Sequence, residues 1–143
     1  IYKEMTYLGL DLGSKTCGVA ISDRTGIIAT SLEVIRYYDY EDLLHQLELI
    51  VIERKVDAFV LGNPLNLDGS ISKRSEITLE FKDILIEKFH KDVFMQDERL
   101  STVEAENLLI SNDTNRKNRK KVIDKIAASI ILQAFLDRRS YEK

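Results

Sequence analysis

The chain has 143 residues and a net charge of −3, with 44% hydrophobic and 31% charged side chains. This length favours a single domain over residues 1–143, and the composition excludes a disordered chain. One cysteine and two histidines exclude an internal disulfide and argue against a structural zinc site. No apolar run is long enough to span a membrane and the first residues do not form a signal peptide, so we expect a cytoplasmic protein without membrane contacts. Met5 is the expected native start, with residues 1–4 an added or disordered beginning.

The first part of the sequence predicts three short strands. Apolar and β-branched residues mark Tyr7 to Asp11, Cys17 to Asp23 and Ile27 to Arg36, with glycine-containing turns between them. Consecutive strands joined by short turns predict a three-strand meander.

The hydrophobic period then changes from that of a strand to that of a helix. Apolar residues from Leu43 to Val51 fall on one helical face, and later segments alternate between the two periods. The segments expected after this helix are a strand at Ala58–Leu61, a loop at 63–72, a helix from Ser72 to about His90, a strand at Val93–Asp97, a helix opened by the capping box at Ser101–Glu104, a polar basic segment at 112–120 and a helix from about Lys121 to Arg138. This order predicts an α/β fold, with a mixed five-stranded sheet and flanking helices.

Three acidic residues are the candidates for chemistry. The first, fourth and fifth strands are expected to be parallel, so Asp11 and Asp97 should share the edge where ligands bind in such sheets. Asp124 falls inside the apolar stripe of the last helix, where a carboxylate needs a partner. Strand ends and a helix N-terminus also explain such acids without any function. If the three converge, their repulsion calls for cations, and two Mg²⁺ or Mn²⁺ ions would suit phosphodiester hydrolysis.

Basic residues precede Asp124 and are candidates for binding a phosphate backbone. These are Arg116, Lys117, Arg119, Lys120 and Lys121. The alternative interpretation is a solvated loop. An uneven charge distribution is weak support for a polyanionic partner, because residues 99–143 carry 10 basic and 6 acidic side chains.

Four motifs in order resemble the YqgF (RuvX) family of Holliday-junction-resolvase-like nucleases, which is linked to maturation of the 5′ end of pre-16S rRNA. The motifs run from Asp11 to Asp23, from Gly62 to Gly69, from Asp97 to Thr102 and from Asp124 to Ala128, and the likeness covers nearly the whole chain. The resemblance implies an RNase H-like fold and a metal-dependent nuclease of the cytoplasm. It implies metal binding by Asp11, Asp97 and Asp124 and leaves open whether Asp97 or Glu98 coordinates the metal.

Further residues near the expected rim are candidates for contacts with the substrate. Lys15, Asn63 and Arg99 join the basic residues as candidate substrate-binding positions, with Arg99 placed to bind a phosphate oxygen. RNA is favoured over branched DNA as the partner. Contacts with ribosome-associated factors and the choice between monomer and homodimer stay open.

Two alternatives from other classes remain. The first motif is also similar to the phosphate loop of sugar kinases and Hsp70-type ATPases, but that fold needs two lobes and generally more than twice this length. The second alternative is a non-catalytic nucleic-acid-binding module with the same fold. Cys17 and the histidines are expected to serve packing or to lie at the surface.

Overall fold

A computed structural model describes residues 4–98 and 116–141, although the side chains of residues 116–121, 123, 124 and 141 fall outside the description. The elements are β1 (Tyr7–Leu12), β2 (Thr16–Ser22), β3 (Ala29–Arg36), α1 (Tyr40–Arg54), β4 (Ala58–Asn63), α2 (Lys73–Phe89), β5 (Asp92–Asp97) and α4 (Arg116–Tyr141). The helix expected from Ser101 to Ile110 and the candidate Arg99 lie outside the described residues.

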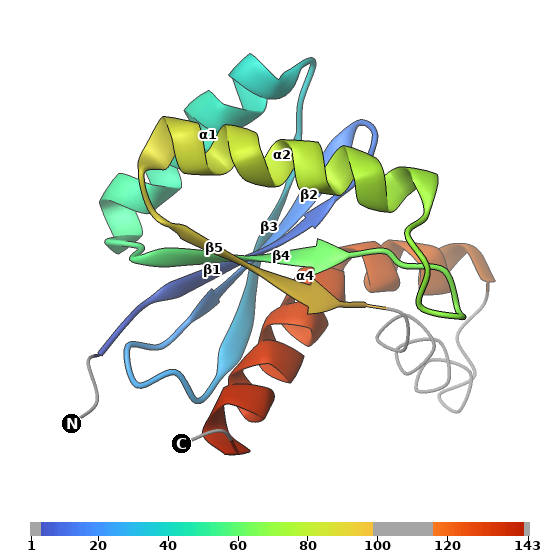
Figure 1. Cartoon of the computed structure of the whole chain (residues 1–143). Coiled ribbons are helices and arrows are strands. Elements are labelled where there is room, and N and C mark those ends of the chain that lie inside the picture. Colours follow the sequence, from blue (N-terminus) through green and yellow to red (C-terminus); the bar gives the residue numbers. More distant parts are fainter. Residues whose placement is uncertain (1–3, 99–115, 142–143) are drawn as a thin grey trace.

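The strands form one mixed sheet with helices on both faces. The five strands are ordered β3-β2-β1-β4-β5. β2 runs antiparallel to both β1 and β3, whereas β4 is parallel to β1 and β5 is parallel to β4. Figure 1 shows α1 and α2 over one face and α4 across the other. The expected meander, the parallel strands and the α/β class are therefore confirmed.

Local side-chain hydrogen bonds set the ends of α1 and α2. The side chain of Asp39 accepts a hydrogen bond from the Asp42 N–H, and that of Ser72 accepts one from the Ser75 N–H. Each bond satisfies one of the amides that a helix start leaves without a partner. α2 therefore begins directly after Ser72, within a residue of its expected start.

Each face of the sheet has its own core, because side chains of a strand alternate between faces. Leu8, Leu10 and Phe59 belong to the cluster beneath α1 and α2, whereas Tyr7 and Val60 pack under α4. α4 lies directly on the sheet at Gly9. A Cβ atom at Gly9 would lie only 2.8 Å from Cβ of Leu132.

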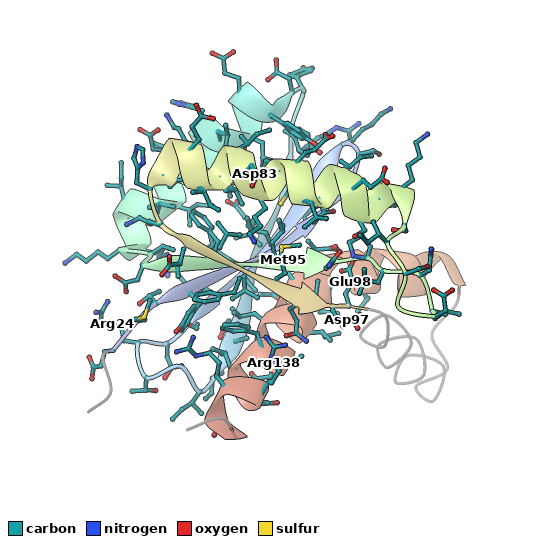
Figure 2. All side chains as sticks on the ribbon, viewed as in Figure 1. Arg24, Asp83, Met95, Asp97, Glu98 and Arg138 are labelled. Atoms are coloured by element: carbon teal, nitrogen blue, oxygen red, sulfur yellow. The ribbon has the colours of Figure 1, made fainter. Side chains whose placement is uncertain are left out.

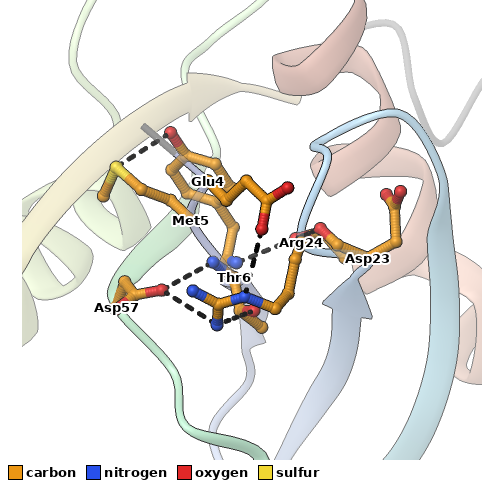
Figure 3. A network of polar contacts seen from close by, with 8 residues as sticks. Glu4, Met5, Thr6, Asp23, Arg24 and Asp57 are labelled. Atoms are coloured by element: carbon orange, nitrogen blue, oxygen red, sulfur yellow. Dashed lines mark hydrogen bonds and ion pairs between the residues drawn. The ribbon is translucent and has the colours of Figure 1, made fainter. Parts of the chain in front are cut away.

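Polar contacts tie the strands together at the amino end of β1 (Figure 3). The Thr6 N–H donates to the Asp57 carboxylate at 2.8 Å, and Nη1 of Arg24 lies 3.7 Å from the same carboxylate. Nη1 of Arg24 also donates to the Thr6 hydroxyl at 3.3 Å. This network joins the β2–β3 turn to the starts of β1 and β4, at the end of the sheet opposite Asp11.

Two element boundaries differ from the sequence prediction. β3 begins at Ala29, because the N–H groups of Ile27 and Ile28 both donate to the Asp23 carboxylate and form a turn instead of a strand. α4 begins at Arg116, so the expected loop at 116–120 is wrong and the basic residues lie in a helix. Arginine and lysine favour helices, and neither glycine nor proline interrupts residues 116–141.

No helix in the described parts of the chain has the length and apolar character needed to cross a membrane.

Candidate active site at the carboxyl ends of the parallel strands

The carboxyl ends of β1, β4 and β5 form one rim of the sheet. Leu10 pairs with Leu61, and Gly62 pairs with Gln96, so Asp11 stands level with Gly62 on the neighbouring strand. This placement matches the expectation that the acids at the strand ends share an edge.

The alternation of side chains decides which acids share a face. Tyr7 packs under α4, so Asp11, four residues later, points to the α4 face as well. On β5, Phe94 packs against the cluster under α4, and the Glu98 carboxyl group lies over Gly62 together with Ile131 of α4, so Glu98 lies on that face. Glu98 therefore stands on the same side of the sheet as Asp11. Figure 2 labels Asp97 and Glu98 together where β5 ends.

Gly62 provides the space in which the two carboxyl groups meet. The Glu98 N–H donates to the Asn63 carbonyl at 3.2 Å and continues the pairing of β5 with β4 by one residue. A Cβ atom at Gly62 would lie 2.8 Å from Oε2 of Glu98 and 2.6 Å from Cδ1 of Ile131 on α4. The Glu98 side chain therefore lies over Gly62, and it shares a hydrogen bond with Asp11.

The surroundings of Glu98 favour its neutral form. Burial raises the pKa of Glu98 to about 7, and the negative charge of Asp11 adds to this rise. The Arg74 cation acts in the opposite direction, and Asp97 contributes a smaller increase. Protonation of Glu98 relieves the repulsion between the two carboxyl groups and supplies the hydrogen of the bond that joins them.

α4 brings Asp124 toward the same rim. Ile131 contacts Gly62 at the rim, whereas Leu136 lies beside Gly26 at the other end of the sheet, so α4 begins on the rim side. Asp124 precedes Ile131 by seven residues, about two helical turns, and its backbone lies on the same side of the helix. Among the side chains that the structure describes, which do not include Asp124, no three potential ligands form a metal-binding group.

The remaining substrate-binding candidates are distributed around this rim. Lys15 is exposed in the β1–β2 turn, and its carbonyl accepts a hydrogen bond from the Tyr37 N–H. Oδ1 of Asn63 accepts a hydrogen bond of 2.7 Å from the Ser75 hydroxyl, so this side chain fixes β4 to α2. The backbone of the basic residues from Arg116 to Lys121 lies in the first turns of α4. Their contacts with a substrate stay predictions.

Arg74 was missed by the sequence analysis. It is the second residue of α2, and its Nη2 donates to the Leu12 carbonyl at 3.0 Å. The only sequence signal is a cation in the first turn of the helix that follows the loop after Asn63. This guanidinium is the described cation that acts on Glu98.

Comparisons with known proteins agree with this arrangement. The family described as "RuvX: Holliday junction resolvase" matches residues 5–138. A protein of Bacillus cereus (strain B4264) named "Putative pre-16S rRNA nuclease" is 48% identical over 94% of this chain and 100% of its own length. A protein of the same name from Geobacillus kaustophilus is 47% identical, with 93% of this chain and 98% of that protein covered.

Solved structures show the fold at much lower identity. The fowlpox virus Holliday junction resolvase has a TM-score of 0.54 at 15% identity, covering 94% of this chain and 99% of that one. Thermus thermophilus RuvC has a TM-score of 0.51 at 13% identity, covering 95% of this chain and 97% of that one. These likenesses confirm the RNase H-like fold. Since the family match spans nearly the whole chain at high identity to its relatives, this protein belongs to the RuvX family.

Proposed function

We propose that this protein is a metal-dependent nuclease that hydrolyses phosphodiester bonds and processes the 5′ end of pre-16S rRNA. The observation that carries the proposal is the Asp11–Glu98 pair, held together at the rim where RNase H-like sheets expose their strand ends. The names of the curated relatives support the rRNA substrate.

The residues present fit a Mg²⁺ or Mn²⁺ site. Asp11 and Glu98 are hard oxygen donors whose mutual repulsion raises the pKa of Glu98, and a divalent cation between them would relieve this repulsion. Oε1 of Gln96 adds a third oxygen on the same face, since it is buried and accepts no hydrogen bond from the described residues. Metal ions bound at this site would activate a water molecule and neutralise the charge that develops on the phosphate.

The proposed ligands follow from the facing of the strands. Asp11 and Glu98 share the α4 face, and Asp124 lies on the helix that covers that face. Between Asp97 and Glu98, the shared face favours Glu98 as the ligand. Asp97 would act through its charge, which already raises the pKa of Glu98.

Cations around the rim would hold the substrate backbone. Arg74 acts on the acidic pair from α2, Lys15 is exposed in the β1–β2 turn on the same rim, and Arg99 follows Glu98 directly in the sequence. The helical start of α4 would present Arg116, Lys117, Arg119, Lys120 and Lys121 to phosphates. Such contacts position a nucleic acid without reading its sequence.

A specific observation favours branched DNA as a second candidate substrate. The family description names a Holliday junction resolvase, and the fowlpox resolvase shares the fold. Pre-16S rRNA fragments and four-way DNA junctions should therefore be offered side by side. Cleavage of the rRNA fragment alone supports the first assignment, whereas cleavage of the junction alone supports the second.

The test of the metal site compares Asp11→Asn with the wild type across a titration of Mg²⁺ and Mn²⁺. Asparagine keeps the shape of aspartate without its charge, so cleavage should be lost while the melting temperature stays equal or rises in metal-free buffer. Asp83→Asn makes the same change at an exposed position of α2 and is the matched control. Equal activity of Asp11→Asn and wild type would refute the site. Tight binding of nucleic acid without any cleavage by the wild type would favour a non-catalytic module.

A further inference from the structure

A cavity of about 430 Å³ opens on the rim, on the face that α1 and α2 cover. Its lining residues are Leu12, Gly13, Ser14, Tyr37, Tyr38, Asp39, Tyr40, Arg74, Ile77 and Thr78. Three chain segments meet there, namely the β1–β2 turn, the connection from β3 to α1, and the first turns of α2 (Figure 1). The size and the mixture of aromatic walls with a few polar groups are typical of a ligand site.

Two of the three tyrosines are held in place before any ligand binds. The Tyr37 hydroxyl donates to the Gly13 carbonyl, and its ring centroid lies 6.2 Å from that of Tyr40. The Tyr40 ring in turn lies 5.0 Å from Phe81 of the core. Rings fixed in this way lose little conformational freedom when a flat partner binds.

Tyr38 is different, because its side chain is 100% exposed. A fully exposed tyrosine next to a cavity buries no apolar surface in the fold, although aromatic surface gains most from burial. Its neighbours Tyr37 and Asp39 both serve the fold, one through the Gly13 carbonyl and the other as the N-cap of α1. Tyr38 therefore has an aromatic face free for a ligand.

Arg74 connects the cavity to the acidic pair. Its guanidinium donates to the carbonyl of Leu12, the residue after Asp11, and it is close enough for its charge to act on Glu98. The same side chain lines the cavity. A group in the cavity would therefore contact an arginine whose charge also acts on the Asp11–Glu98 pair.

We infer that this cavity receives a single unpaired nucleobase of the substrate strand, stacked on Tyr38, while the adjoining phosphate lies at Arg74 on the rim. The inference rests on the proposed nuclease function and names the form of substrate, a strand with an unpaired base beside the bond to be cleaved. Aromatic side chains that accept splayed bases are the common means of binding single-stranded RNA.

The first experiment uses the absence of tryptophan from the sequence. Tyr38→Trp places the one tryptophan of the variant at the cavity, and a short single-stranded RNA should quench the tryptophan emission by stacking. Ile52→Trp is the matched control, because Ile52 is 68% exposed near the other end of α1, about 18 Å along the helix from Tyr40. Quenching in Tyr38→Trp and not in Ile52→Trp supports the site. Equal emission changes in both variants, or none in either, overturn it.

The second experiment measures how much one base of the RNA contributes to binding affinity, by removing that base. An abasic position is moved along the RNA, and affinities are measured with wild type, Tyr38→Ala and Tyr38→Phe in buffer with a chelator to prevent cleavage. Tyr38→Ala should weaken binding by about 5- to 150-fold, the range expected for one base–aromatic stack, whereas Tyr38→Phe should bind normally. One abasic position should weaken binding to wild type and add no further loss in Tyr38→Ala. Independent losses at every position would overturn the inference.

Cleavage assays separate this inference from the proposed function. If the wild type cleaves but Tyr38→Ala cleaves equally well with unchanged affinity, the nuclease assignment stands and the base site is refuted. If no substrate is cleaved but the Tyr38→Trp emission is quenched by single-stranded RNA, the base site stands without the nuclease.

Discussion

Replacing Glu98 with glutamine tests the acidic pair without any substrate or metal. Glutamine has the shape of a protonated glutamate, and its amide can still donate to the Asp11 carboxylate beside Gly62. It cannot ionise. Glu98→Gln should therefore behave like a wild type whose Glu98 stays protonated at every pH, and the two proteins should differ only where Glu98 loses its proton.

The sign and size of the difference in unfolding free energy between the two proteins follow from the raised pKa of Glu98. Burial and the charge of Asp11 raise the pKa of Glu98 from 4.5 to about 7 in the folded state. Between these values the folded protein binds more protons than the unfolded chain, so the free energy of unfolding falls as pH rises. A shift of this size corresponds to about 2–3 kcal/mol once partial solvent exposure is taken into account. In a domain of this length, that equals a difference in melting temperature of roughly 4–12 °C.

The assay is urea and thermal unfolding of both proteins in metal-free buffer from pH 4 to pH 8. The wild type should lose stability relative to Glu98→Gln as pH rises from about 4.5 to about 7, and the difference should level off above that range. Mg²⁺ should then restore the wild type at high pH and act little on the variant. Glu53→Gln, at an exposed position of α1, is the matched control. Parallel pH profiles for wild type and Glu98→Gln would refute the placement of Glu98 against Asp11.

Three further predictions concern other parts of the structure. Gly9→Ala places a Cβ atom 2.8 Å from Cβ of Leu132 and should destabilise the protein by about 1–3 kcal/mol in urea unfolding; unchanged stability would mean that α4 does not sit on β1. Arg74→Gln removes the cation that lowers the pKa of Glu98, so the Glu98 carboxyl should titrate at higher pH in ¹³C NMR spectra, whereas Arg74→Lys should titrate as the wild type. The Cys17 thiol is completely buried, and burial raises its pKa, so a thiol reagent should modify it only after unfolding; fast modification of the native protein would contradict the position of β2 in the core.

The sequence predicted the sheet and its rim because these depend on hydrophobic period and chain order. Parallel strands at β1 and β5 place Asp11 and the Asp97–Glu98 pair at one edge, whatever the details of the loops. Which member of the pair faces Asp11 depends on a single residue of register, since neighbours in a strand point to opposite faces. The composition and spacing of the sequence do not show whether Asp97 or Glu98 faces Asp11. The structure does so through the packing of Phe94.

Other parts of the site depend on contacts between distant segments. Arg74 reaches Leu12 across 62 positions of the chain, and the loop between β4 and α2 sets its position. The cavity lined by Tyr37, Tyr38 and Tyr40 is likewise formed by three segments that are far apart in the chain. A sequence pattern within one segment does not predict contacts between segments that are far apart in the chain. The role of Asp124 stays a prediction, supported by its place on α4.

The position of α4 in the chain has a consequence for how the protein is made. Among the described elements, α4 alone covers the face of the sheet formed by Tyr7, Val60 and Phe94, and it follows all five strands in the sequence. During synthesis the strands of this face leave the ribosome before α4 does, and apolar surface exposed in that interval favours aggregation. Asp11 and Glu98 also lack the cover of Ile131 until then. A nascent chain thus carries the five described strands, with Asp11 and Glu98 at their ends, before the helix that packs over them is complete.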